Sequence, residues 1–164
     1  MNYEILKSNE DQSVNFVTPF GKGKLECRYV HRGGDYFIIY VSSHSGCNFS
    51  CRFCHLTATG QTTFDQVGFD EYIDQVEQVM EYYNLISTPP LKKVHFNFMA
   101  RGEPLANNTV INEGERLIAE MNNIASWNNL EGSVRLSTIM TNTIDRSLEE
   151  MLGRSEERHV GIGW

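Results

Sequence analysis

Segments of strand character and segments of helix character alternate along most of this chain. Short apolar runs typical of strands lie at residues 36–41, 94–99, 134–140 and 159–164. Between them come an amphipathic segment from Phe69 to Tyr83, a second helical pattern opening at Asn108, and a short one that Ser147 and Glu150 begin as a capping box. This alternation predicts an α/β fold with parallel strands and right-handed crossovers.

The region before residue 36 carries a weaker pattern. Residues 1–23 are poorly patterned, and Pro19 and Gly21 predict a loop there. Residues 24–30 alternate well enough for a strand, and the Gly-rich turn that follows predicts a hairpin with residues 36–41. A short β-hairpin region should therefore precede the alternating part.

The length of the chain limits how much of such a fold it can build. It has 164 residues, whereas a closed (β/α) barrel takes about 200 or more. We therefore expect a partial (β/α) barrel with only about the first half present. Residues 36–164 would form a core truncated at the C-terminus, and residues 1–35 an N-terminal extension. The alternative is a natural half-barrel that a partner chain completes.

Three closely spaced cysteines follow the first of the parallel strands. Cys47, Cys51 and Cys54 have the spacing C-x3-C-x2-C. Three thiolates would leave one iron of a four-iron cluster without a protein ligand, and an open position on a metal is where an exogenous ligand binds. A Cys3His zinc site that adds His44 is the main alternative. Buried structural thiols, or a disulfide with a spare cysteine, fit this spacing less well.

Composition narrows the class of protein. The net charge of −7 argues against a non-specific nucleic-acid binder, although a small RNA site remains compatible with it. No stretch approaches the length of a membrane span, and residues 1–10 are polar, unlike a signal peptide. We expect a cytoplasmic protein, because a reducing compartment suits free thiolates.

Several stretches together resemble a known family. The cysteine spacing, with Phe53 before the last cysteine, is similar to that of the radical S-adenosylmethionine (SAM) superfamily. The segments that extend this likeness read Val-Ser-Ser-His-Ser-Gly-Cys from Val41, Phe-Met-Ala-Arg-Gly-Glu-Pro-Leu-Ala-Asn from Phe98, and Val-Arg-Leu-Ser-Thr from Val134. They resemble Val-Ser-Ser-Gln-x-Gly-Cys, Phe-Met-Gly-Met-Gly-Glu-Pro-Leu-x-Asn and Val-Thr-x-Ser-Thr of the radical SAM methyltransferases that modify carbon 2 of adenine in 23S rRNA. The carbon 8 resistance enzymes are related to that family.

The resemblance implies roles for individual residues. The three cysteines would ligate a 4Fe-4S cluster, whose open iron would bind SAM and whose electron would cleave it. Gly102 and Glu103 would bind the methionine amino group of SAM, and Ser137 would donate a hydrogen bond to SAM. Glu26 falls near a glutamate that the family uses as proton acceptor. An rRNA or tRNA substrate and an electron donor such as flavodoxin or ferredoxin are the implied partners.

Two departures bear on the reaction. The family has a cysteine seven residues before the first cluster cysteine, where this chain has Tyr40, and tyrosine cannot form the disulfide that releases product. Cys27 could substitute for it, although a buried spare cysteine is the simpler interpretation. His55 after Cys54 also resembles glycyl-radical activases, which usually carry Gly-Gly-Glu-Pro in place of Arg101-Gly102-Glu103-Pro104.

Overall fold

One sheet of seven strands organises the molecule. The computed structural model describes residues 3–86, 90–141, 145–152 and 158–162, the last of these in backbone only. The strands lie side by side in chain order: β1 Glu4–Lys7, β2 Val14–Phe20, β3 Gly23–Val30, β4 Tyr36–Tyr40, β5 Lys93–Phe98, β6 Glu131–Thr138 and β7 Arg158–Ile162. Neighbours from β1 to β4 pair antiparallel, and those from β4 to β7 pair parallel. The predicted α/β class is confirmed.

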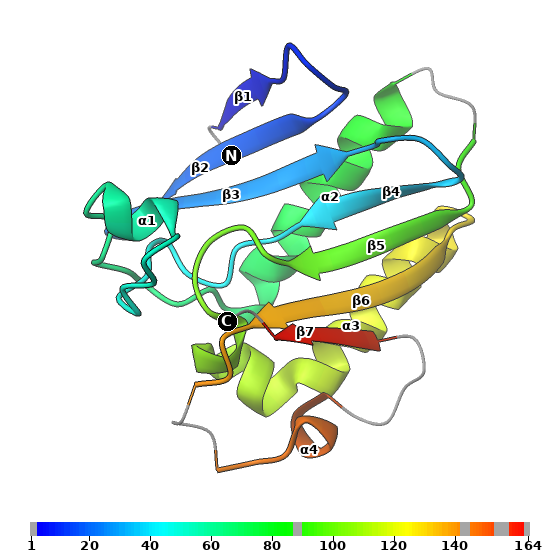
Figure 1. The fold of residues 1–164 in the computed structure, drawn as a ribbon. Coiled ribbons are helices and arrows are strands. Elements are labelled where there is room, and N and C mark those ends of the chain that lie inside the picture. The colour runs from blue at the N-terminus through cyan, green and yellow to red at the C-terminus, as the bar shows by residue number, and fades with distance from the viewer. Residues whose placement is uncertain (1–2, 87–89, 142–144, 153–157, 163–164) are drawn as a thin grey trace.

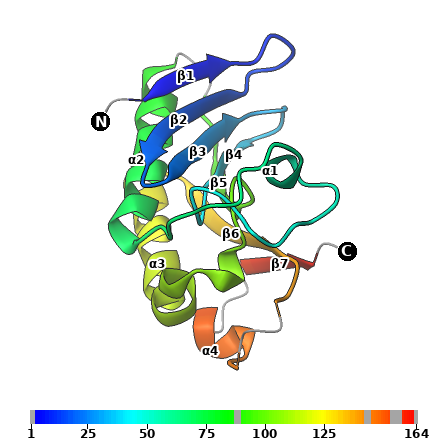
Figure 2. The ribbon, with the colours of Figure 1, turned by 90° about the vertical axis from the view of Figure 1, so that its left-hand side faces the viewer.

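Two long helices connect the parallel strands. Helix α2 (Phe69–Leu85) follows β4, and α3 (Asn108–Trp127) follows β5. Both lie along the same face of the sheet (Figures 1 and 2), as right-handed crossovers in one direction require. The shorter helices are α1 (His55–Ala58), a 3-10 turn η1 (Pro104–Ala106) and α4 (Leu148–Leu152).

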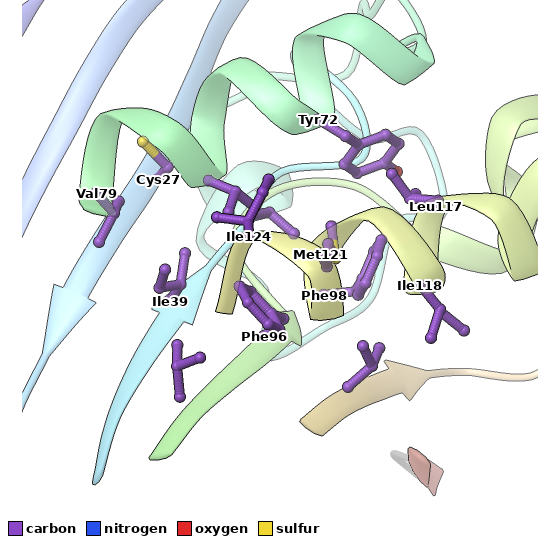
Figure 3. Close-up of a cluster of buried hydrophobic side chains, with 14 of the residues drawn as sticks. Cys27, Ile39, Tyr72, Val79, Phe96, Phe98, Leu117, Ile118, Met121 and Ile124 are labelled. Carbon is purple, nitrogen blue, oxygen red and sulfur yellow. The ribbon is translucent and has the colours of Figure 1, made fainter. Parts of the chain in front are cut away.

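The core lies between the sheet and these two helices. Phe96 and Phe98 of β5 meet Met121 and Ile124 of α3 there (Figure 3), and all four side chains are buried. Phe37 of β4 also stacks on a helix residue, Tyr83, with ring centroids 4.4 Å apart. The apolar stripe predicted for residues 69–83 is therefore core, and its burial supplies the main driving force for folding.

Some local predictions were wrong. Residues 4–7 and 14–20 form strands, not a loop, because β2 finds a complete antiparallel partner in β3. The third parallel strand was expected at residues 134–140 but runs from Glu131 to Thr138. The cap of α3 is Asn107, not Asn108. The β3–β4 hairpin and the capping box at Ser147 and Glu150 are confirmed. The sequence also predicts that Pro89-Pro90 stops the first long helix and that Gly153 ends the last one. Helix α2 ends at Leu85, and Pro89 and Gly153 lie outside the described residues.

The opposite face of the sheet carries polar side chains. In the described residues no long helix covers it, and Figure 2 shows α2 and α3 on the other side only. Residues on a strand alternate between faces, so every second residue of β3 to β6 points there. The loops that follow β4, β5 and β6 gather at the carboxyl ends of these strands (Figure 1), where folds with parallel strands place their chemistry.

Candidate functional site

The cysteine loop leaves β4 and returns through α1. Its amide groups hold it locally, since Cys47 N donates to Gln61 O (3.1 Å) and Cys54 N donates to Cys51 O (3.0 Å). Ser50 has a positive φ of 56°, which tightens the turn between the first two cysteines. Cys47, Cys51 and Cys54 are all free thiols of intermediate exposure, so the loop presents three uncommitted ligands.

The loop after β5 supplies the second part of the site. Gly102 has φ +86°, and a Cβ there would lie 2.5 Å from His44 Nδ1, so only glycine fits. Glu103 is 5% exposed, and its carboxylate accepts hydrogen bonds from Leu105 N (3.1 Å) and Ile139 N (3.1 Å). Its orientation is therefore fixed by two loops.

The end of β6 supplies the third part. Ser137, the predicted residue, lines the same cavity as the cysteines. Its neighbour Thr138 was missed by the sequence reasoning, although its buried hydroxyl donates to Glu103 Oε1. The signal was present in the alternation, because Thr138 continues the buried series of Val134 and Leu136 and a buried hydroxyl requires a partner.

These three parts enclose one cavity of about 410 Å³. The polar lining groups are the three cysteines, Gly102, Glu103, Ser137 and Thr138. Phe49, Phe53, Leu56, Met99 and Ile139 form most of its apolar wall. A mainly apolar cleft of this volume with a few convergent polar groups is typical of a small-molecule site.

Acidic groups crowd the cavity. Burial raises the pKa of the Cys47 thiol, and the nearby charges of Cys54, Cys51 and Glu103 raise this pKa further, while the Phe49 backbone opposes them. Negative charges on these groups repel one another at this range. A bound cation or cationic cluster would relieve the repulsion, so this donor set fits a metal centre in its chemistry.

The geometry does not assemble the Cys3His zinc site. His44 is 3% exposed and packs edge-on against Phe64, with its Nδ1 3.1 Å from Ser43 Oγ. It is absent from the cavity lining. Within the described part of the chain, no three His, Cys, Asp or Glu side chains converge closely enough to hold a single ion, and this applies to the three cysteine thiols as well as to His44. Burial lowers the pKa of His44 to about 4, against a weaker opposing effect of the Ala106 backbone, so the ring is neutral at pH 7.

Arg101 connects the segments around the cavity. Its guanidinium is 3% exposed and donates to Glu26 Oε1 (2.7 Å), Ser45 O (3.1 Å) and the side chain of Gln61. Its carbonyl accepts from Ser43 N (2.8 Å). The sequence did not reveal this role of Arg101, because these partners are 40 to 75 residues away from it along the chain.

Glu26, predicted as a proton acceptor, is held in that ion pair. Burial raises the pKa of Glu26, but hydrogen bonds from Asn15 and Arg101 outweigh burial and leave the pKa below its usual value. Glu26 does not line the cavity. In this structure it contributes to the support of the site, and its predicted catalytic role stays a prediction.

Asn107 is a second connecting residue. It is fully buried; its Nδ2 donates to Ser43 O and Val67 O (both 2.9 Å), and its Oδ1 caps α3 at Val110 N (3.1 Å). One amide thus joins the cysteine segment, the segment before α2 and the start of α3. Such use of all its hydrogen-bonding groups fixes their relative positions.

Cys27 cannot take the place of the missing thiol. It faces α2, donates to Gln78 Oε1 (3.1 Å), and burial raises its pKa to about 12. Tyr40 lies on the other face of the sheet by strand alternation. The two side chains are therefore separated by the sheet.

A larger groove lies on the helix side, away from the cysteines. It has a volume of about 750 Å³ between the N-terminal strands and α2, and its wall includes Glu71, Asp74, Glu77 and Glu81. This acidic wall is unsuited to RNA phosphates. In the described residues no helix is long and apolar enough to cross a membrane.

Comparison with known proteins agrees with the sequence motifs. The chain is 41% identical over 70 residues to a probable dual-specificity RNA methyltransferase RlmN of Gloeobacter violaceus, which is 42% of this chain and 18% of that protein. It is 34% identical over 123 residues to the probable RlmN of Clostridium beijerinckii, 71% of this chain and 31% of that protein. It is 26% identical over 149 residues to RlmN of Campylobacter jejuni, 91% of this chain and 38% of that protein. No family model matches.

The chain thus spans less than two-fifths of the length of these curated relatives. The matched parts include most of the chain, so the likeness does not rest on the cysteine spacing alone. This chain resembles the dual-specificity RNA methyltransferases named RlmN over as much as 91% of its length.

Proposed function

We propose that this chain forms the cofactor-binding part of a radical SAM enzyme similar to the RNA adenine methyltransferases. One observation carries the proposal: all three predicted cysteines, Gly102, Glu103 and Ser137 line a single cavity. They come from two loops and the end of β6, which are far apart in sequence. In support, the relatives reported above are named as RNA methyltransferases.

Each residue has a role that follows from its position. Cys47, Cys51 and Cys54 would hold a 4Fe-4S cluster; when bound, such a cluster offers an open iron to SAM and supplies the electron that cleaves it. Glu103 would pair with the methionine ammonium through its remaining lone pair on Oε2. Thr138 and Ile139 N keep that carboxylate turned into the cavity. Ser137 would donate a hydrogen bond to the bound cofactor.

The same proposal extends to the fold and the partners. Strands β4 to β7 would be the first half of a (β/α) barrel, with residues 36–164 as the core and residues 1–35 as its extension. An RNA substrate and a flavodoxin or ferredoxin as electron donor would be the partners. The proposal covers SAM cleavage only. Methyl transfer needs a further thiol, and this chain has Tyr40 at the position where the family has that cysteine.

The experiment is anaerobic reconstitution of the chain with iron and sulfide. We expect a brown protein with broad absorption at about 400 nm, and 5′-deoxyadenosine after reduction with SAM present. Cys51→Ala should abolish the absorption, and Cys27→Ala should keep it, because Cys27 lies on the helix side. Glu103→Gln should keep the absorption and weaken SAM binding. A colourless protein with one tightly held zinc would contradict the proposal.

A further inference from the structure

A row of polar side chains crosses the helix-free face of the sheet. Strand pairing places five residues opposite one another from β2 to β6: Asn15, Arg28, Tyr40, Asn97 and Arg135. Directly paired residues have side chains on the same face. These five residues, the cross-sheet row, therefore form one continuous polar strip.

Burial on the other face confirms which way the row points. Cys27, Ile39 and Leu136 alternate with row residues along their strands and are buried in the core beneath α2 and α3. Asn97 lies between Phe96 and Phe98, which both point toward the helices (Figure 3). The row residues must then point away from the helices.

Hydrogen bonding in the row is incomplete. Asn15 Oδ1, Asn97 Oδ1 and Arg135 Nε are buried atoms without a partner among the described residues, and Asn97 as a whole is 7% exposed. Buried polar groups in folded proteins are almost always paired, because an unmade hydrogen bond is costly. Within the part of the chain that the structure describes, the core Tyr29 hydroxyl is unpaired as well, so it is the position of the row atoms on the helix-free face that points to a ligand. The two amide oxygens would accept from a ligand hydroxyl or amine, and Arg135 Nε would donate to a ligand oxygen.

The charge of the row is positive. Neither Arg28 nor Arg135 forms an ion pair with any described residue. Glu26, the acidic neighbour on the same face, is occupied by Arg101 and Lys24, and Glu131 near the far end is occupied by Lys93. In a chain of net charge −7, two free guanidinium groups on one face favour an anionic ligand.

The row also lies close to the cavity. Ser137 lines the cavity and is two residues beyond Arg135 on the same face of β6, a rise of about 7 Å. Arg28 and Arg135 are three strands apart, roughly 14 Å between Cα atoms, which leaves room for a ligand larger than one phosphate. Tyr40 and Asn97 lie between the two arginines.

We propose that the cross-sheet row binds the phosphate of a nucleotide. Arg135 and Arg28 would donate hydrogen bonds to phosphoryl oxygens, and Asn97 and Tyr40 would hydrogen-bond the polar groups attached to the phosphate. This inference rests on the proposed function and adds to it a position for the phosphate of the substrate. The phosphate would lie at Arg135, two residues before the cavity residue Ser137 on β6. Tyr40 then has a substrate-binding role at the position where the family has a cysteine.

The test is calorimetric binding of adenosine monophosphate, adenosine and a short single-stranded oligoribonucleotide. Binding is measured on Cys51→Ala protein, which holds no cluster, and on the reconstituted chain. Nucleotide binding can then be detected even if the chain binds no cluster or SAM. We expect the monophosphate to bind at least tenfold more tightly than adenosine, and Arg135→Gln to remove about tenfold or more of that affinity. Arg116→Gln is the matched control. It removes the same positive charge from α3, where Arg116 pairs with Glu113 and lies away from the row.

The two sources of phosphate give different results. If the phosphate belongs to RNA, the oligoribonucleotide binds more tightly than the monophosphate, both Arg28→Gln and Arg135→Gln weaken it, and each lowers its salt dependence by about one ion. If the phosphate belongs to a mononucleotide, the monophosphate binds as tightly as the oligoribonucleotide does. Arg135→Gln then lowers this affinity more than Arg28→Gln does. The proposal is overturned if neither ligand binds, or if Arg135→Gln and Arg28→Gln change affinity no more than Arg116→Gln does.

Discussion

The cavity rim and the cross-sheet row differ in how their polar groups are satisfied. At the rim, Arg101, Glu103 and Asn107 are buried, and each makes several protein hydrogen bonds. In the row, Asn97 and Arg135 carry buried atoms with no partner among the described residues. Satisfied groups hold a structure together, whereas unsatisfied groups cost stability until something binds.

This difference separates two kinds of substitution. Removing a rim side chain leaves buried partners unpaired, so it should lower the free energy of unfolding. Removing Arg28 or Arg135 from the row takes away a guanidinium that forms no ion pair with any described residue, so it should affect binding and leave stability nearly unchanged. Substitutions in the two regions test this contrast, from the largest expected effect to the smallest.

Arg101→Met should cost the most stability, about 3–5 kcal/mol, because it leaves the partly buried carboxylate of Glu26 with only Lys24, 3.8 Å away, as a cation. It also leaves Ser45 O and the Gln61 side chain without their donor. Urea unfolding measures the loss. Arg116→Gln, an exposed arginine with one local ion pair, should change stability by less than about 1 kcal/mol. Adding Glu26→Gln to Arg101→Met should recover part of the loss; no recovery would show that the ion pair is not the cause.

Asn107→Ala should cost about 2–3 kcal/mol, since it removes the cap of α3 and leaves Ser43 O and Val67 O without their side-chain donor. Thermal and urea unfolding give the value. Asn108→Ala is the control, because its side chain caps nothing in the structure. Equal losses from the two substitutions would contradict the assigned cap.

Acid should destabilise the protein through His44. Its pKa is about 4 in the folded protein and 6.5 when exposed, so the unfolded chain takes up the proton first. The stability that neutral His44 contributes is fully present above about pH 6.5. It falls as the pH drops toward 4, and the free energy of unfolding then changes by up to about 1.4 kcal/mol per pH unit. Unfolding at a series of pH values measures this slope. His44→Gln should flatten it and His31→Gln should not, and the reverse result would assign the effect elsewhere.

Gly102→Ala should cost more than Gly60→Ala. Both glycines have positive φ, +86° and +68°, but only Gly102 has atoms of His44 and Ser43 where a Cβ would lie. The shared backbone term is about 1 kcal/mol, and the clash adds about 1–2 kcal/mol. Unfolding of the two variants side by side isolates the difference, and a difference near zero would show that His44 moves aside freely.

Arg135→Leu should change stability least, within about 0.5 kcal/mol, since its buried Nε has no partner to lose. The same variant should lose nucleotide affinity. Urea unfolding and calorimetry on one preparation test both statements. A loss of stability as large as that of Asn107→Ala would show that Arg135 supports the fold, as Arg101 and Asn107 do, and would contradict its assignment to binding.

The sequence predicted the alternating elements and the residues of the cavity better than it predicted their supports. The segment from Phe69 to Tyr83 carries its own periodicity, and the cysteines carry their own spacing, so both are local signals. Arg101 and Asn107 act through partners on other loops. Their roles depend on the folded arrangement, which no short stretch of sequence encodes.

Two misses have related physical causes. Strands β1 and β2 lack a strong pattern of their own and are stabilised by pairing along β3, which is a tertiary effect. Asn107 and Asn108 are chemically identical as caps, and the choice between them is decided by the buried carbonyls that only Asn107 reaches.

The Arg101 carbonyl has a consequence for the way the site would take up its cofactor. Because Ser43 N and His44 N both donate to it, the start of the cysteine segment is already tied to the Gly102 loop, and Cys47 N and Cys54 N are also engaged. Among the described residues, the amides of residues 48–53 donate to no backbone carbonyl, although the Phe49 amide interacts with the Cys47 thiol. The conformational entropy lost on loading would then be confined to one short arc of chain, which keeps the cost of assembly small.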